Sequence, residues 1–167
     1  MPSRRSLRRL LRAALRWALP TRMVAAYSEH RDGVPTREVL WRYLSGLPEF
    51  SLLTWTRHSW MTYSNKDGAI GGRLFTDGQF EYSVTRRAIT LLRDLGLLNG
   101  GLLVDVGANI GTVTVTLLRE GIFRRAVAVE PIPGNYRRLT RNLWLNGLRH
   151  RVRRFRPLWD ASPAPSL

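Results

Sequence analysis

The sequence predicts an α/β fold built around a parallel sheet. Two short apolar runs, residues 102–106 and 125–130, have the length and composition of strands, and a helical pattern of apolar residues follows each of them. Strands that alternate with helices are joined by right-handed crossovers, so consecutive strands lie parallel in one sheet. Because the first run is almost continuously apolar, we expect it to be buried on both faces. Residues 152–156 predict a third, weaker strand.

Two helices are expected within this unit. Residues 110–119 contain a Thr-Val-Thr-Val-Thr stretch that by itself favours a strand. The glycine turn before it and Gly121 after it favour a helix instead. The second helix begins at Pro133, a residue suited to a first helical turn, and ends near Gly147. Its predicted buried stripe consists of Tyr136, Leu139, Leu143 and Trp144.

A smaller accessory region is predicted before this unit. Thr36 caps a short helix that Pro48 ends, and residues 84–95 form a helix that Gly96 stops. Between them, two Asp-Gly pairs indicate turns that join short antiparallel strands. These pairs are Asp67-Gly68 and Asp77-Gly78. The expected organisation is a basic helix at 1–22, accessory helices and a hairpin at 23–98, and the α/β unit at 99–167.

Residues 1–19 predict a basic amphipathic helix, because six arginines and no acidic residue accompany leucines and alanines at helical spacing. The segment is too charged for the core of a signal peptide. A helix on an anionic membrane surface, an organelle-targeting segment and an ordinary terminal helix all fit this pattern. Residues 95–118 carry a single charge, but their glycines argue against a membrane-spanning helix. We expect a cytoplasmic protein, with peripheral attachment to a membrane as the other option.

The net charge of +15 over 167 residues is extreme, and arginine supplies nearly all of it, since Lys66 is the only lysine. Such a surface attracts phosphates, anionic lipids and acidic partners. A bias toward arginine also follows from GC-rich coding, which weakens the case for nucleic acid. The chain has no cysteine, and its three histidines match no metal spacing, so no metal site is expected.

Acidic residues and glycines gather where the first two predicted strands end. Asp105 lies at the end of the first run and is followed by Gly107-Ala108-Asn109-Ile110-Gly111, while Glu130 ends the second run. Glycines let the backbone approach a nucleotide-like ligand, and a carboxylate at a strand end accepts hydrogen bonds from ribose hydroxyls. The spacing is Gly-x-Asn-x-Gly, so the dinucleotide pattern is not met, and we predict S-adenosyl-L-methionine (S-adenosylmethionine) as the ligand. The alternatives are strand-end or surface carboxylates and, for Asn109, a role in the turn alone.

The same segments resemble the FkbM family of S-adenosylmethionine-dependent methyltransferases. The resemblance covers roughly residues 70–160. It rests on Asp105–Gly111, on Val129-Glu130-Pro131, on the Asn142–Gly147 segment Asn-Leu-Trp-Leu-Asn-Gly, and on the lead-in Phe75–Glu81. It implies a Rossmann-like class I methyltransferase fold and O-methylation of a hydroxyl on a sugar or another secondary metabolite.

The resemblance also implies roles for individual residues. Asp105 would lie near the amino-acid end of the cofactor, and Glu130 would take both ribose hydroxyls. Pro131 and Ile132 would pack by the adenine, and Asp160 would reach the adenine amino group. Close backbone approach would involve Gly107, Ala108, Asn109 and Gly111. No residue is assigned as the catalytic base.

The chain departs from this family after the third strand. A class I methyltransferase has seven strands in the order 3-2-1-4-5-7-6, whereas this sequence predicts strands one to three and then ends at Leu167. We therefore expect a truncated methyltransferase with an incomplete parallel sheet, in which strand one forms an exposed apolar edge. A partner chain that completes the sheet and a non-catalytic remnant are both compatible with this pattern.

The alternative function is that of a basic nucleic-acid-binding protein. No acidic residue lies between Glu130 and Asp160, and Trp144 and Phe155 could stack on bases. This stretch contains Arg137, Arg138, Arg141, Arg149, Arg151, Arg153, Arg154 and Arg156. A solvated helix face combined with coding bias explains the same arginines, so nucleic acid is the less favoured partner.

Overall fold

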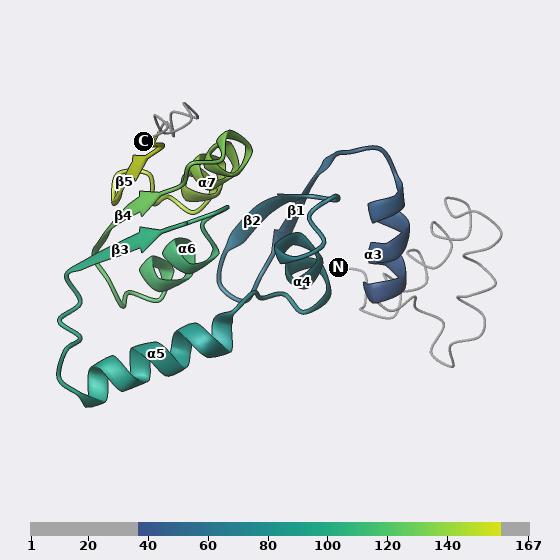
Figure 1. The fold of residues 1–167 in the computed structure, drawn as a ribbon. Coiled ribbons are helices and arrows are strands. Elements are labelled where there is room, and N and C mark those ends of the chain that lie inside the picture. The colour runs from purple at the N-terminus through teal and green to yellow at the C-terminus, as the bar shows by residue number, and fades with distance from the viewer. Residues whose placement is uncertain (1–36, 158–167) are drawn as a thin grey trace, which may run out of the picture. The chain divides into compact units, whose positions relative to one another are not determined.

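The computed structural model describes residues 37–157 (Figure 1). The basic helix expected at residues 1–22 and the candidate residue Asp160 therefore lie outside the described residues. The chain divides into two compact units, residues 1–46 and 47–167. In the first unit, helix α3 spans Arg37–Gly46, which confirms the short helix predicted before Pro48.

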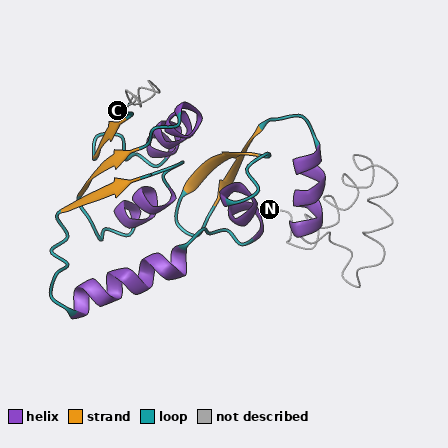
Figure 2. Ribbon diagram, in the orientation of Figure 1, coloured by secondary structure: helices purple, strands orange, loops and turns teal. Residues whose placement is uncertain are grey.

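The second unit contains the predicted parallel sheet. Its strands are β3 (Leu102–Val106), β4 (Arg125–Val129) and β5 (Val152–Phe155), in the order β3-β4-β5. Helix α6 (Thr112–Arg119) connects β3 to β4, and helix α7 (Pro133–Leu145) connects β4 to β5 (Figure 2). All five predicted elements are confirmed. The apolar stretch that includes β3 and α6 is thus a strand, a turn and a helix, and no helix in the described part of the chain could cross a membrane.

The two faces of the sheet differ in burial. Ala126 and Ala128 of β4 are buried on the face that α6 and α7 cover, because both right-handed crossovers place their helices on the same side. On the opposite face, the β3 side chains of Leu102, Val104 and Val106 are 55%, 59% and 77% exposed. The expectation that this strand is buried on both faces is therefore wrong. Strand β3 does lie at an edge of the sheet, as the expectation of an exposed apolar edge predicted.

An antiparallel hairpin precedes the sheet. Strand β1 (Ser51–Trp55) pairs with strand β2 (Trp60–Ser64), which confirms the predicted hairpin. Its turn is closed by Thr56, whose backbone amide and hydroxyl donate to the Ser59 carbonyl at 2.8 and 2.9 Å. The turn residues are Thr-Arg-His-Ser, so neither Asp-Gly pair forms it.

The two Asp-Gly pairs instead flank a short helix, α4 (Ile70–Thr76). Asp67 Oδ1 accepts a hydrogen bond from the Ile70 amide at 2.9 Å, and Asp77 directly follows the last residue of the helix. The prediction that these pairs join strands is wrong, because an aspartate satisfies the free amides of a helix start as readily as it forms a strand turn.

Asn142 of α7 and Asn146, which directly follows the helix, bind the edge of β2 that β1 leaves open. Asn142 accepts from the Thr62 amide at 2.7 Å and donates to the Thr62 carbonyl at 3.2 Å. Asn146 makes the same pair of bonds with Trp60, at 2.9 and 2.7 Å. Asn142 and Asn146 are four residues apart, a rise of about 6 Å along a helix, which is close to the two-residue step between Trp60 and Thr62 in a strand. Their side-chain amides therefore make the hydrogen bonds that a third strand would otherwise make with β2. Asn142 is fully buried and also donates to the Ile110 carbonyl at 2.8 Å, which connects the hairpin to the glycine turn.

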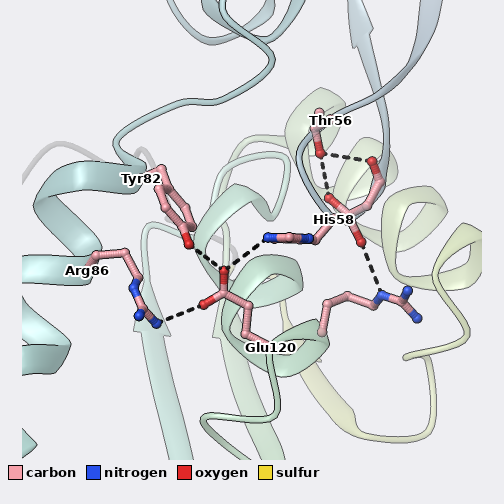
Figure 3. A network of polar contacts seen from close by, with 7 residues as sticks. Thr56, His58, Tyr82, Arg86 and Glu120 are labelled. Carbon is pink, nitrogen blue, oxygen red and sulfur yellow. Dashed lines mark hydrogen bonds and ion pairs between the residues drawn. The ribbon is translucent and has the colours of Figure 1, made fainter.

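Glu120, directly after α6, joins the hairpin turn and helix α5 (Tyr82–Asp94) to the α/β unit (Figure 3). Its carboxylate accepts the Tyr82 hydroxyl at 2.8 Å and lies 3.2 Å from Arg86 Nη1 and 3.9 Å from His58 Nε2. The hydrogen bond to Glu120 raises the pKa of the Tyr82 phenol. Because the eight residues of α6 span about 12 Å, this cluster lies about a helix length from the glycine turn.

Candidate functional site

The glycine segment forms a tight turn beyond the carboxyl ends of β3 and β4. The backbone amides of Gly107 and Ala108 both donate to the Val129 carbonyl, at 2.9 and 3.0 Å. The φ angles of Gly107, Asn109 and Gly111 are +81°, +51° and +90°. These left-handed conformations turn the chain from β3 into α6 within a few residues. The backbone of Asn109 therefore serves the turn, whereas a ligand contact by its side chain stays a prediction.

Glu130 lies immediately after β4 and is only 4% exposed. Its Oε2 accepts the Asn109 amide and its Oε1 accepts the Ile132 amide, each at 2.8 Å. The carboxylate thus joins the glycine segment to the backbone that leads into α7, and it is not a surface carboxylate. Each carboxylate oxygen can accept a second hydrogen bond, so the contact to ribose hydroxyls stays a prediction.

Asp105 is half-buried in β3, and its Oδ2 accepts a hydrogen bond from the Thr114 hydroxyl of α6. Burial raises the pKa of Asp105, and the charge of Glu130 acts in the same direction, while the hydrogen bond from Thr114 opposes the rise. Partial burial and a nearby second carboxylate both disfavour the ionised form of a carboxyl group, and a bound cation offsets this effect. Asp105 is therefore well placed to bind a positively charged group.

The remaining candidate residues differ in accessibility. Pro131 is half-buried and Ile132 is 57% exposed, so the backbone after Glu130 presents apolar surface. Ala108 is buried. Among residues 37–157, no group of three or more histidine, aspartate or glutamate side chains is close enough to hold a metal ion.

Replacing Gly111 by alanine is expected to lower the free energy of unfolding by about 2–4 kcal/mol, because left-handed backbone strain and overpacking add. A Cβ at this position would lie 2.6 Å from Leu139 Cδ1 in α7. Urea denaturation followed by circular dichroism measures the change. Gly107→Ala is the matched control: its φ is similar, nothing lies within 4 Å of its Cβ position, and it should lose about 1–2 kcal/mol. Equal losses would contradict the packing of this turn against α7.

Two residues that position the site were given no role from the sequence, although Asn142 belongs to a segment that carries the family resemblance. Thr114 is fully buried and donates to Asp105, and Asn142 holds the Ile110 carbonyl. The sequence does indicate that Thr114 is buried, because Thr114 lies three residues before Leu117 and four before Leu118, on the predicted buried face of α6. A polar side chain on such a face needs a buried partner.

Sequence comparison gives the family of the chain. A model of the family described as precorrin methyltransferase domain matches residues 74–160, just over half of the 167 residues. The chain belongs to this methyltransferase family. The matched part of the methyltransferase domain includes the three-stranded sheet, the glycine turn and Glu130. No curated protein matches the chain.

Several solved structures are similar to the methyltransferase domain at low sequence identity. A proposed tRNA (m1A22) methyltransferase from Streptococcus pneumoniae is 22% identical with a TM-score of 0.36, over 42% of this chain and 32% of that chain. A proposed RNA methyltransferase from Pyrococcus horikoshii is 18% identical with a TM-score of 0.38, over 74% and 52%. Geranyl diphosphate C-methyltransferase from Streptomyces coelicolor A3(2) is 15% identical with a TM-score of 0.35, over 75% and 47%. The matches thus span about a third to a half of the length of these structures.

Proposed function

We propose that the chain binds S-adenosylmethionine beside the turn between β3 and α6, as the cofactor-binding part of an O-methyltransferase. The observation that carries the proposal is the buried Glu130 carboxylate, which joins the glycine turn to the start of α7 at the carboxyl edge of a parallel sheet. Ligands of such sheets bind in the crevice outside the carboxyl ends of the strands. The family match supports methyl transfer as the reaction.

The residues at this edge fit S-adenosylmethionine chemically. The half-buried carboxylate of Asp105 suits the ammonium group at the amino-acid end. Space around the Cβ position of Gly107 leaves the backbone open to a ligand. Glu130 has acceptor capacity for ribose hydroxyls, and Ile132 offers exposed apolar surface to the adenine. When bound, the cofactor supplies an electrophilic methyl group, and the role of these residues is to hold and orient it.

For the methyl acceptor we propose a hydroxyl of a sugar or secondary metabolite, as in the FkbM family that the sequence resembles. A second candidate is a precorrin, because the matched family carries that description. Both acceptor classes can be compared by mass spectrometry of products formed with labelled S-adenosylmethionine. Attachment of residues 1–19 to an anionic membrane is compatible with either acceptor.

We further propose that methyl transfer requires a partner chain that pairs with β3. The strand lies at the edge of the sheet, and the outward side chains of Leu102, Val104 and Val106 are more than half exposed. Exposed apolar edges of this kind favour pairing with another strand. The net charge of +15 disfavours a second copy of the chain as the source of that strand.

Calorimetric titration of the full chain with S-adenosylhomocysteine tests the cofactor site, with Asp105→Asn as the informative variant. We expect micromolar binding by the wild type and about 10- to 100-fold weaker binding by the variant, because a charge-assisted hydrogen bond to the ammonium group is lost. Because the pKa of Asp105 is raised, lowering the pH should begin to weaken wild-type binding while the pH is still above 3.8, the ordinary pKa of an aspartate. Unchanged affinity of Asp105→Asn would contradict the role of Asp105, and no binding by the folded wild type would contradict the proposal.

Stability separates loss of the site from loss of the fold. Because its pKa is raised, folded Asp105 holds its proton more tightly than the unfolded chain does, so its contribution to stability falls as the pH rises from 3.8 through the raised pKa. Asparagine removes that unfavourable ionisation, and its Oδ1 can still accept from Thr114. The variant should therefore be at least as stable as the wild type at neutral pH when both are compared by thermal unfolding.

A further inference from the structure

A groove with a volume of 890 Å³ runs along one face of α7. Its α7 residues lie at helical spacing on one side of the helix: Tyr136, Arg137, Thr140, Arg141, Trp144 and Leu145. Leu53 and Thr62 of the hairpin and Arg154 of β5 also line it. The groove is therefore built from three elements, and it shares no residue with the candidate cofactor site.

The arginines of this region fall into groups with different roles. Arg138 pairs with Glu49 at 3.1 Å, and Arg151 donates to the carbonyls of Leu118, Phe123 and Arg124. The arginines that line the groove are Arg137, Arg141, Arg149 and Arg154. Within residues 37–157 none of these four forms an ion pair, and the groove lining includes no acidic residue. Their positive charge is thus available to an anionic ligand.

Aromatic surface accompanies this charge. Trp144 was predicted in the buried stripe of α7, but it is 64% exposed and lines the groove together with Tyr136, so that prediction is wrong. Phe155, the other aromatic residue considered for base stacking, is exposed on the open face of the sheet and does not line the groove. The Thr140 hydroxyl is buried and has no hydrogen-bond partner among the described residues, so the lining also contains an unsatisfied polar atom.

We infer that this groove binds single-stranded nucleic acid. Arg137 and Arg141 are one turn apart, about 6 Å along α7, and can contact successive phosphates of an extended strand. Trp144 offers a ring on which a base can stack, the combination of charge and aromatic surface that single-stranded sites use. A concave groove suits an extended polymer, whereas binding to a bilayer requires apolar side chains that project from a helix face into the interface. The charge of the groove suits either anion, and its concave shape favours nucleic acid over a membrane.

Fluorescence anisotropy with a labelled 12-nucleotide oligouridine tests the inference on the full chain. Trp144→Ala should weaken binding by about 5- to 100-fold through the lost stacking contact. The double variant Arg137→Gln/Arg141→Gln should reduce the slope of log affinity against log salt by about 1.4, because each phosphate contact to a single strand contributes about 0.7. Trp144, Arg137 and Arg141 are all exposed, so the variants should fold, and circular dichroism checks that they do.

A matched control is needed because residues 1–19 carry arginines that attract any polyanion. Arg87→Gln/Arg93→Gln on exposed positions of α5 removes the same charge outside the groove and should leave the affinity within about twofold and the slope within about 0.3 of wild type. Equal weakening by both double variants, or Trp144-independent binding that heparin abolishes equally in every variant, would overturn the inference. Trp144-dependent binding to phosphatidylserine vesicles without oligouridine binding would overturn it in favour of a membrane.

Discussion

Replacing Glu130 by alanine is expected to lower the free energy of unfolding by about 3 kcal/mol and to abolish binding of S-adenosylhomocysteine, because two buried amides lose a charged acceptor. The carboxylate accepts the amides of Asn109 and Ile132, each at 2.8 Å, in a position that is 4% exposed. Alanine leaves both amides without that partner. Chemical denaturation of the full chain measures the stability, and calorimetry at a temperature where the variant is folded measures the binding.

Glu130→Gln is the matched control for this prediction. Its single carbonyl oxygen can accept from one of the two amides, while its NH₂ group faces the other, so the loss should be about half that of alanine. A loss below about 1 kcal/mol for Glu130→Ala would show that the amides of Asn109 and Ile132 are satisfied in another way. The same result would remove the observation that carries the proposed cofactor site.

Replacing Asn142 by alanine should have the largest effect on stability, about 4 kcal/mol, because three buried backbone groups lose their partner at once. These groups are the amide and carbonyl of Thr62 and the carbonyl of Ile110. The change removes the connection between the hairpin, α7 and the glycine turn. Urea denaturation measures the total loss, and hydrogen exchange at the Thr62 amide reports the release of β2.

Asn146→Ala, at the residue that directly follows α7, provides the comparison. Asn146 makes the equivalent pair of bonds to Trp60, but these bonds lie at an exposed position where water can replace them. Its loss should therefore be about 1 kcal/mol. If both variants lost the same amount, burial of the Asn142 bonds would not be the source of the effect.

The elements of the α/β unit could be predicted because local composition determines them. The apolar runs before Asp105 and Glu130 form strands β3 and β4, and the glycine segment between them forms the turn into α6, in spite of its Thr-Val-Thr-Val-Thr stretch. Here the helix boundaries set by glycine outweighed the strand propensity of valine and threonine. The position of Asp105 and Glu130 at one edge follows from the parallel order of the strands.

The orientation of Glu130 could not be predicted, because a carboxylate at a strand end can point to a ligand or to the backbone. The two bonds from Asn109 and Ile132 depend on the turn geometry, which only the folded chain defines. The side chain of Asn142 bonds to Thr62, 80 residues away in sequence, and to Ile110, 32 residues away, so no local pattern could indicate these partners. The exposure of the Val104 side chain could not be predicted from the sequence either, since an apolar run has the same composition whether or not a neighbouring element covers it.

The roles of the arginines between Glu130 and Asp160 also could not be predicted from the sequence. Their number indicated only a charged surface, which coding bias could also produce. The structure assigns six of these eight arginines to distinct roles: Arg138 pairs with Glu49, Arg151 binds carbonyls, and four line one groove. Sequence spacing alone could not make this division, because it depends on the hairpin that packs against α7.

The central claim is that the turn between β3 and α6, together with Glu130, forms a cofactor site. Backbone amide resonances of the full chain, recorded while S-adenosylhomocysteine is added, test it most directly. We predict saturable shifts at residues 107–111 and at Ile132, with little change at Trp144 and Arg149 in the groove. Shifts confined to the groove, or none at saturating ligand in a folded chain, would contradict the account.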